Sequence, residues 1–288
     1  MQPLCANDRS TAPSGPAAPR RRAAGGLLLL AAALLLAACS QLKLGYNNAD
    51  TLLAYSLDSY LRLDDAQRRQ ARASIANLHR WHRGTQLPTY ARLLDDARQR
   101  IEGPVAAADV LAFNAEVNRS LAAIGDQVAP DLAQLALTLR PEQLERLADR
   151  LARDTSKARR ELVRFAGPES LDQRVERYVE RAEEWFGRRS PAQKEKVRAS
   201  LASRPDAQEA WMSERERRQR DLVAVLTRIS AEQPPPEAAA AWVREYFAQL
   251  AEPRDAARRA LLAEVRAGNA ALVADLLNSA SPAQRATI

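Results

Sequence analysis

Apolar residues recur at helical spacing along almost the whole of this 288-residue chain. Val175, Tyr178, Val179 and Ala182 follow one another three or four residues apart, as residues on one face of an α-helix do. We find no convincing run with the alternation of apolar and polar residues that is typical of a half-buried β-strand. Glycine occurs only ten times, and strand-forming aromatic residues are scarce. The sequence therefore predicts an all-α protein, a multi-helix bundle or a stack of helical hairpins, with about ten helices.

Four short phrases mark where helices should begin, near residues 64, 141, 191 and 282. In each, a glutamine stands three residues after the first residue of the phrase. The phrases are Asp64-Asp65-Ala66-Gln67, Arg140-Pro141-Glu142-Gln143, Ser190-Pro191-Ala192-Gln193 and Ser281-Pro282-Ala283-Gln284. A serine at the N-cap can accept a bond from the third amide of the helix, and the glutamine can reach back to the N-cap amide. Proline suits the first position of a helix.

Other prolines and glycines divide the chain, since proline costs roughly 3 kcal/mol inside a helix. The expected joints are Gly84 to Pro88, Gly103-Pro104, Gly167-Pro168, Arg204-Pro205, Pro234-Pro235-Pro236 and Glu252-Pro253. Residues 206–233 should form one long helix. We expect a tether and first helix over residues 39–62 and a main helical body over 63–233. Residues 237–288 should form a C-terminal helical unit, either separate or part of the same domain.

A lipid-attachment signal is indicated near the N-terminus. Three arginines, Arg20 to Arg22, precede an apolar run from Leu27 to Ala38, and the run ends in Leu36-Ala37-Ala38-Cys39. A positive segment, a short apolar segment and small residues at the cleavage site describe a secretory signal. Leu-Ala-Ala-Cys resembles the lipobox of bacterial lipoproteins. That resemblance implies cleavage between Ala38 and Cys39, with residues 1–38 as the signal peptide and diacylglycerol and an N-acyl chain on Cys39.

The alternatives for this segment are a transmembrane anchor and a cleaved signal without lipid. The apolar run is about a dozen residues long, whereas a membrane-spanning helix needs roughly 20. Ser40 follows the cysteine. A serine directly after the cysteine resembles the pattern of lipoproteins sent to the outer membrane. In enteric bacteria, an aspartate at that position favours retention in the inner membrane. We therefore expect a lipid-anchored protein of the outer membrane that faces the periplasm.

Composition argues against nucleic-acid binding. Residues 1–38 contain four of the 43 basic residues and one of the 36 acidic ones, so the remaining 250 residues carry a net charge of +4. A basic stripe with interleaved aromatic residues would be expected of a nucleic-acid binder, and the chain has none. The two cysteines are Cys5, within the signal, and Cys39, so no disulfide is expected.

The candidate chemistry after residue 39 rests on two histidines, His79 and His82, three residues apart beside Trp81. Both could reach one ligand, but zinc sites usually combine more donors than one histidine pair. His82 continues the apolar stripe of Ile75 and Leu78, so we expect a partly buried core residue, no metal and no cofactor. We find no catalytic motif and expect no enzymatic activity.

Charge spacing within the expected helix 206–233 has a simpler interpretation. Glu214 with Arg218, and Glu216 with Arg220, stand four residues apart with the glutamate first, the favourable order for pairs on a helix surface. We interpret this segment as a solvated helix face.

The stretch after Cys39 resembles a family of uncharacterised proteobacterial lipoproteins. It contains Leu44-Gly45-Tyr46-Asn47-Asn48-Ala49-Asp50, and the resemblance is sharpest over residues 39–95. This resemblance implies a helical envelope lipoprotein, and it supplies no activity or catalytic residues. Leu139-Arg140-Pro141-Glu142-Gln143 also resembles the Leu-Thr-x-x-Gln phrases of the smaller Spy-type periplasmic chaperones, but Arg140 replaces the threonine.

These observations favour a non-enzymatic envelope protein that acts by binding, as an adaptor or in a chaperone-like role. Its expected partners are the membrane, through the lipid, and an envelope protein whose identity stays open, as does the oligomeric state. The alternative is a cell-envelope enzyme with a cleft near His79 and His82.

Overall fold

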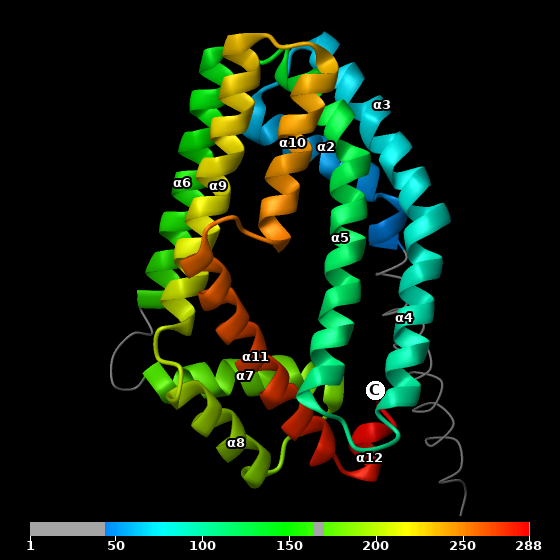
Figure 1. The fold of residues 1–288 in the computed structure, drawn as a ribbon, viewed down its shortest axis with the longest axis vertical. Helices are drawn as coiled ribbons and strands as arrows, with labels where there is room; N and C mark the ends of the chain where they lie inside the picture. Colours follow the sequence, from blue (N-terminus) through cyan, green and yellow to red (C-terminus); the bar gives the residue numbers. More distant parts are fainter. Residues whose placement is uncertain (1–43, 164–169, 288) are drawn as a thin grey trace, which may run out of the picture. The chain divides into compact units, whose positions relative to one another are not determined.

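α-Helices, with no β-strand among them, form the part of the chain that the computed structural model describes, residues 44–163 and 170–287. The chain divides into two compact units, Met1–Ala49 and Asp50–Ile288, and the contacts reported below lie within the second. The elements of Figure 1 are α2 (Ala49–Leu61), α3 (Asp65–Trp81), the π-helix η1 (His82–Gln86), α4 (Leu87–Arg100), α5 (Ala107–Ala136), α6 (Pro141–Val163), α7 (Ser170–Phe186), α8 (Pro191–Ala202), α9 (Ala207–Glu232), α10 (Pro236–Ala251), α11 (Ala256–Asn278) and α12 (Pro282–Arg285). The all-α prediction is confirmed.

All four predicted helix starts are confirmed. α3, α6, α8 and α12 begin within one residue of the expected positions. In α8, the Ser190 hydroxyl accepts a hydrogen bond from the Gln193 amide at 3.2 Å, and the Gln193 side chain accepts one from the Ser190 amide at 2.9 Å. The same reciprocal capping box opens α3 and α12. In α6, where Arg140 replaces the capping residue, the Arg140 amide still donates to Gln143 Oε1 at 3.0 Å.

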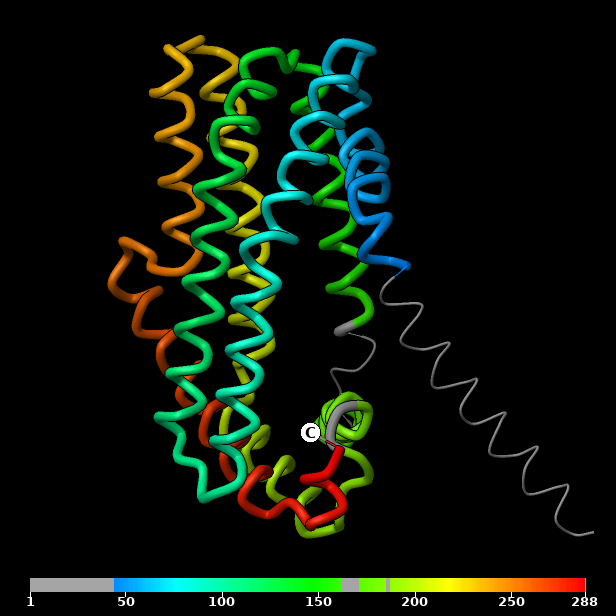
Figure 2. The backbone as a smooth tube through the Cα atoms, turned by 90° about the vertical axis from the view of Figure 1, so that its right-hand side faces the viewer, coloured from blue at the N-terminus to red at the C-terminus, as the bar shows by residue number. Residues whose placement is uncertain are grey.

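The predicted joints are confirmed with one exception among the described residues. Four of them lie between helices, and α9 is the long helix expected over 206–233. The joint predicted at Gly84 to Pro88 is wrong, because α3, η1 and α4 follow one another without interruption (Figure 2). The Leu87 amide donates to the carbonyl of His82, five residues back, as in a π-turn. Pro88 follows directly after this π-turn, as the second residue of α4. Gly167-Pro168 lies outside the described residues.

Two separate groups of buried side chains hold the helices together. The larger one lies where α2, α3, α5, α6, α9 and α10 meet, and includes Leu61, Ala133, Leu144, Ile229 and Val243. The smaller one joins α7 and α8 to α11, and consists of Val175, Val179, Val197, Leu272 and Leu276. The second unit of the chain is therefore stabilised at two places, and the long helices α5 and α9 run between them (Figure 1).

α5 contacts the largest number of neighbouring helices, among them α3, α9, α10 and α11. It approaches α10 closely at Gly125. A Cβ atom at Gly125 would lie 2.7 Å from Cβ of Phe247, which is shorter than any real contact of that kind. Glycine at this position therefore lets the two helix backbones come together.

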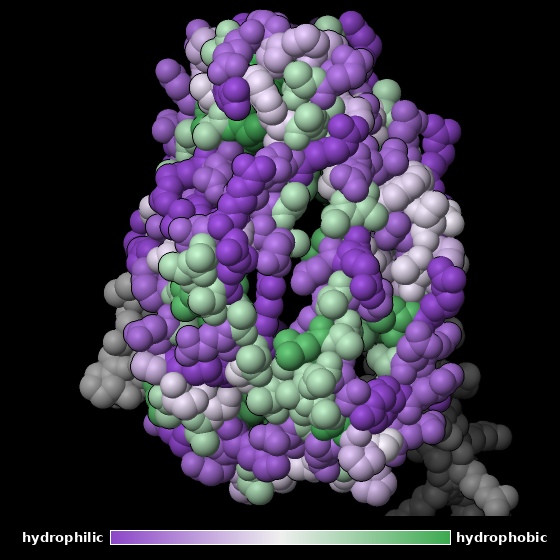
Figure 3. Space-filling model, viewed as in Figure 1, coloured by the Kyte–Doolittle hydropathy of each residue, from purple (hydrophilic) through white to green (hydrophobic). Residues whose placement is uncertain are grey.

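No helix of the described residues has both the length and the apolar character needed to cross a bilayer. Hydrophilic side chains cover most of the molecular face drawn in Figure 3, and hydrophobic ones gather in smaller areas. This distribution fits helices that bury one apolar stripe and leave the opposite face to water.

A buried ion pair links α9 to α11, which corrects the interpretation of Glu214. Its side chain is only 9% exposed, and it accepts bonds from Arg258 Nη2 at 2.6 Å and Arg258 Nε at 2.8 Å. Arg218 adds the expected bond at 2.7 Å. Burial alone would raise the pKa of Glu214, but the two guanidinium groups outweigh it and lower that pKa. Glu216 pairs with Arg159 of α6 at 3.0 Å, so this face of α9 contacts other helices and is not simply solvated.

The glutamines of the four helix starts pair with one another across the fold. Gln67 Nε2 donates to Gln143 Oε1 at 3.2 Å, and Gln143 Nε2 donates to Gln67 Oε1 at 2.8 Å. Gln193 and Gln284 exchange the same two bonds, each at 3.1 Å. We call Gln67–Gln143 the first glutamine clasp and Gln193–Gln284 the second. One clasp lies beside each group of buried side chains, because Gln67 and Gln143 start α3 and α6, and Gln193 and Gln284 start α8 and α12.

Each clasp also ties together the ends of the preceding helices. Gln67 Nε2 donates to the carbonyl of Thr138, and Gln143 Nε2 to the carbonyls of Leu61 and Arg62. In the second clasp, Gln193 Nε2 donates to the carbonyl of Ser279, and Gln284 Nε2 donates to the carbonyl of Arg188. A residue with left-handed backbone conformation precedes the first helix of each clasp. It is Arg62, with φ of 47°, before α3, and Gly187, with φ of 68°, before α8. The two ends of the fold are thus built on one local plan.

The first clasp should be a major contributor to stability. Gln143→Ala leaves buried acceptors without donors, which costs about 1–3 kcal/mol for each group. We expect the free energy of unfolding, measured by urea denaturation, to fall by about 3 kcal/mol. Gln127→Ala, an exposed glutamine of α5, is the control and should change it by less than about 0.5 kcal/mol.

A double-mutant cycle tests the pairing itself. Because Gln67 and Gln143 share two bonds, the loss in the double variant Gln67→Ala, Gln143→Ala should be smaller than the sum of the single losses by about 1 kcal/mol or more. Additive losses would contradict a direct clasp.

Candidate functional site

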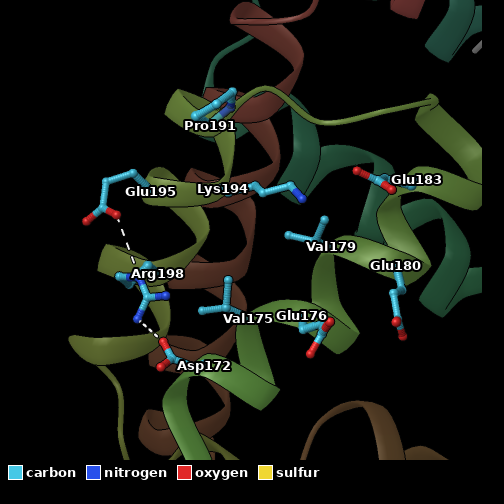
Figure 4. Close-up of a pocket in the computed structure, with 10 residues that line it drawn as sticks. All are labelled: Asp172, Val175, Glu176, Val179, Glu180, Glu183, Pro191, Lys194, Glu195 and Arg198. Atoms are coloured by element: carbon cyan, nitrogen blue, oxygen red, sulfur yellow. Dashed lines mark ion pairs between the residues drawn. The ribbon is translucent and has the colours of Figure 1, made fainter. Parts of the chain in front are cut away.

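The best candidate site is a groove between α7 and α8 (Figure 4). Its cavity has a volume of about 580 Å³. Val175 and Val179 of α7, only 6% and 4% exposed, form its apolar floor, and the exposed Pro191 at the start of α8 lies at its edge. Val197 of α8 is fully buried in the same group of side chains. The floor is therefore part of the smaller core and is held in place by it.

Carboxylates dominate the rim of this groove. Asp172, Glu176, Glu180 and Glu183 follow one face of α7 at intervals of four, four and three residues, and α8 adds Glu195. The cations of the lining are Lys194 and Arg198, both of α8. Five carboxylates against two cations give the groove a negative charge in a protein whose sequence is basic overall.

Three of the five carboxylates already have partners within the protein. Arg198 forms ion pairs with Asp172 and with Glu195, the second at 3.6 Å. Glu183 Oε1 accepts a bond from the Arg189 amide at 2.8 Å.

Glu176 and Glu180 remain available. Within the described part of the chain, neither makes an ion pair or a side-chain hydrogen bond, and both are exposed. On adjacent turns of a helix, side chains four residues apart lie roughly 5–6 Å from each other. The groove thus offers two free carboxylates beside an apolar floor. This combination suits a polypeptide segment with basic side chains at similar spacing and an apolar side chain between them.

A second cavity, of about 500 Å³, surrounds the second glutamine clasp. Its lining includes Gly187, Ser190, Ser281 and the two clasp glutamines. These glutamines already bond to each other and to helix-end carbonyls, and both serines cap helices. This cavity therefore has fewer uncommitted polar groups for a ligand than the groove between α7 and α8.

The two predicted histidines lie at the junction of α3 and η1, away from both cavity linings. His82 is half-buried, as expected, and its Nε2 lies 3.3 Å from the Tyr90 hydroxyl, with the two rings edge to face. Burial lowers the pKa of His82, and the nearby charge of His79 adds to this effect. No group of three or more histidine, cysteine or acidic side chains in the described residues is arranged to hold a metal ion.

The sequence-predicted sites and the groove are different parts of the chain. Ala38 and Cys39 lie outside the described residues. Sequence reasoning missed the groove, although the acidic residues of α7 repeat at helical spacing beside Val175 and Val179. That pattern indicated an amphipathic helix with an acidic border, but it did not show which helix would cover the apolar stripe.

Comparisons with known proteins give one match. A model of a family described as a family of unknown function, DUF6279, matches residues 59–236. The matched segment includes the first glutamine clasp, both histidines and the groove helices α7 and α8. No curated protein and no solved structure matches the chain.

The lowered pKa of His82 predicts a pH dependence of stability. The unfolded chain binds a proton at His82 more readily than the folded chain does. The stabilisation that comes from keeping His82 neutral is therefore complete above the ordinary histidine pKa, near 6.5, and is lost as the pH falls from there through the folded-state pKa. The free energy of unfolding should therefore decrease on acidification below about pH 6.5. In His82→Gln this part of the decrease should vanish in urea denaturation measured between pH 7.5 and pH 5. An unchanged pH profile would contradict the assignment.

Proposed function

From the premise that the chain belongs to this family of unknown function, we propose that it is a lipid-anchored envelope protein that binds segments of other polypeptides. The observation that carries this proposal is the groove between α7 and α8, with its apolar floor and its two uncommitted carboxylates. The preferred ligand is a basic, partly apolar segment of an envelope protein.

The groove is suited to binding for three physical reasons. Its floor is preformed, since Val175 and Val179 are packed against α11 and need no rearrangement to receive an apolar side chain. Its carboxylates are exposed, so they attract a basic segment before contact and orient it in the groove. The second clasp fixes the start of α8, which forms the opposite wall.

The anchor supports the same proposal from the sequence. The lipobox at Leu36 to Cys39 would place acyl chains on Cys39, and Ser40 favours the outer membrane. Two anchoring signals give stable attachment, and the diacylglyceryl group with the N-acyl chain meets that need. In this proposal the helical unit faces the periplasm and binds its partner there, as an adaptor for one protein or as a holdase for several.

Crosslinking in cells tests the groove. A photo-crosslinking amino acid at Lys194, on the α8 wall, should capture one envelope protein or a set of outer-membrane proteins, identified by mass spectrometry. Reversing two charges, Glu176→Lys with Glu180→Lys, should reduce this capture about tenfold, the equivalent of about 1.4 kcal/mol. Asp95→Lys with Asp96→Lys changes the charge equally on exposed residues of α4 and should leave capture unchanged.

Two results would contradict this role for the groove. One is undiminished capture in the groove variant. The other is crosslinking confined to the protein itself, which would favour the enzyme alternative near His79 and His82.

Cys39→Ala tests the anchor separately. The variant should accumulate as unprocessed precursor, because lipid attachment precedes cleavage of a lipoprotein signal. Labelling with radioactive palmitate should disappear. Persistent labelling would overturn lipid attachment at Cys39 without bearing on the groove.

A further inference from the structure

The first half of α2 exposes an apolar face. Leu52, Leu53 and Tyr55 are 57%, 50% and 76% exposed. Leu52 and Tyr55 stand three residues apart, and Ser56 one turn after Leu52, so the three share one side of the helix. Large apolar side chains grouped in this way on a surface commonly mark a contact with a membrane or a partner.

The second half of α2 holds the helix to the body. Leu61 is buried, Leu57 and Tyr60 pack against the larger core, and the Tyr60 hydroxyl donates to Asp154 of α6 at 2.6 Å. The exposed half is the one that follows Cys39 in the sequence, and the packed half comes later. The helix therefore has a fixed end and an end that presents apolar side chains.

Chain length brings this face close to the bilayer. Leu52 stands thirteen positions after Cys39, with twelve residues between them. Even fully extended, they span at most about 45 Å. If Cys39 carries acyl chains, the apolar face of α2 is confined near the membrane surface. Such confinement acts as a high local concentration, so even a weak affinity for lipid produces contact.

We propose that the side of α2 formed by Leu52 and Tyr55 rests in the interfacial layer of the bilayer to which Cys39 is anchored. This inference relies on the proposed lipid anchor. Tyrosine favours the membrane–water boundary, where its ring is apolar and its hydroxyl is hydrated. This side carries a leucine, a tyrosine and the uncharged Ser56, and α2 contains Asp50 and Asp58 but no lysine or arginine. The contact is therefore apolar, and it requires no anionic lipid.

A fluorescent label at residue 56 tests this contact. Ser56→Cys is nearly isosteric and leaves both leucines and Tyr55 intact. From Cys39 onward the chain has no other cysteine, so a thiol reagent will react with residue 56 alone once Cys39 is acylated. The lipidated full chain is labelled with an environment-sensitive fluorophore and reconstituted into phosphatidylcholine vesicles, with or without brominated acyl chains.

Brominated lipid should quench the label at residue 56. It should do so equally at low and high salt, because the contact is apolar. Ser213→Cys, an exposed serine of α9, is the matched control and should not be quenched. Leu52→Glu with Tyr55→Glu, added to Ser56→Cys, should abolish quenching while circular dichroism and the lipid on Cys39 remain unchanged.

The possible failures are distinguishable. Mass spectrometry of the N-terminal peptide reports the lipid directly, so its absence would refute the anchor. A lipidated protein without quenching at residue 56 would overturn the membrane contact alone. A label that is unquenched but whose emission shifts with protein density would assign the face to a second copy of the chain.

Discussion

The glutamine clasps are the interaction on which the rest of the fold depends. Each glutamine caps the start of its own helix, bonds to its partner glutamine and donates to a carbonyl where another helix has ended. Each of these side chains, buried in all but Gln284, thus satisfies backbone groups at two helix termini, which otherwise lack partners. Because each clasp adjoins a group of buried side chains, the polar joints and the apolar cores fix the same helix ends.

The sequence predicted the four helix starts of this arrangement, but not the pairing of their glutamines. A capping box depends on residues within one helical turn, so all four helix starts could be recognised. The pairing could not, because partner glutamines lie 76 and 91 residues apart. The irregular spacing of the phrases shows no fixed sequence period, although in space they form two similar pairs. Of the candidate sites, the partial burial of His82 followed from its apolar stripe, whereas the groove depends on how α7 meets α8.

The errors have related causes. The spacing of Glu214 and Arg218 indicates a surface pair, but Arg258 of α11 covers Glu214, and no local pattern shows which distant helix will do so. Gly84 and Pro88 are helix-breaking residues by propensity, yet the π-turn keeps the chain helical through them, with Pro88 in the first turn of α4. In both places, contacts or backbone geometry specific to this fold outweigh intrinsic preference.

The second clasp also determines how much of the chain must be present before the α8 wall of the groove has all its hydrogen bonds. Gln193 opens the α8 wall, but its partner, Gln284, follows 91 residues later. A chain that is made from its N-terminus contains α7 and α8 early, but the carbonyl of Arg188 and the side chain of Gln193 gain their bonds to Gln284 only when the last residues are present. Until then the apolar stripe of α7 also lacks Leu272 and Leu276 of α11. The two groove helices therefore depend on contacts from residues 79 to 91 positions further along the chain than Gln193.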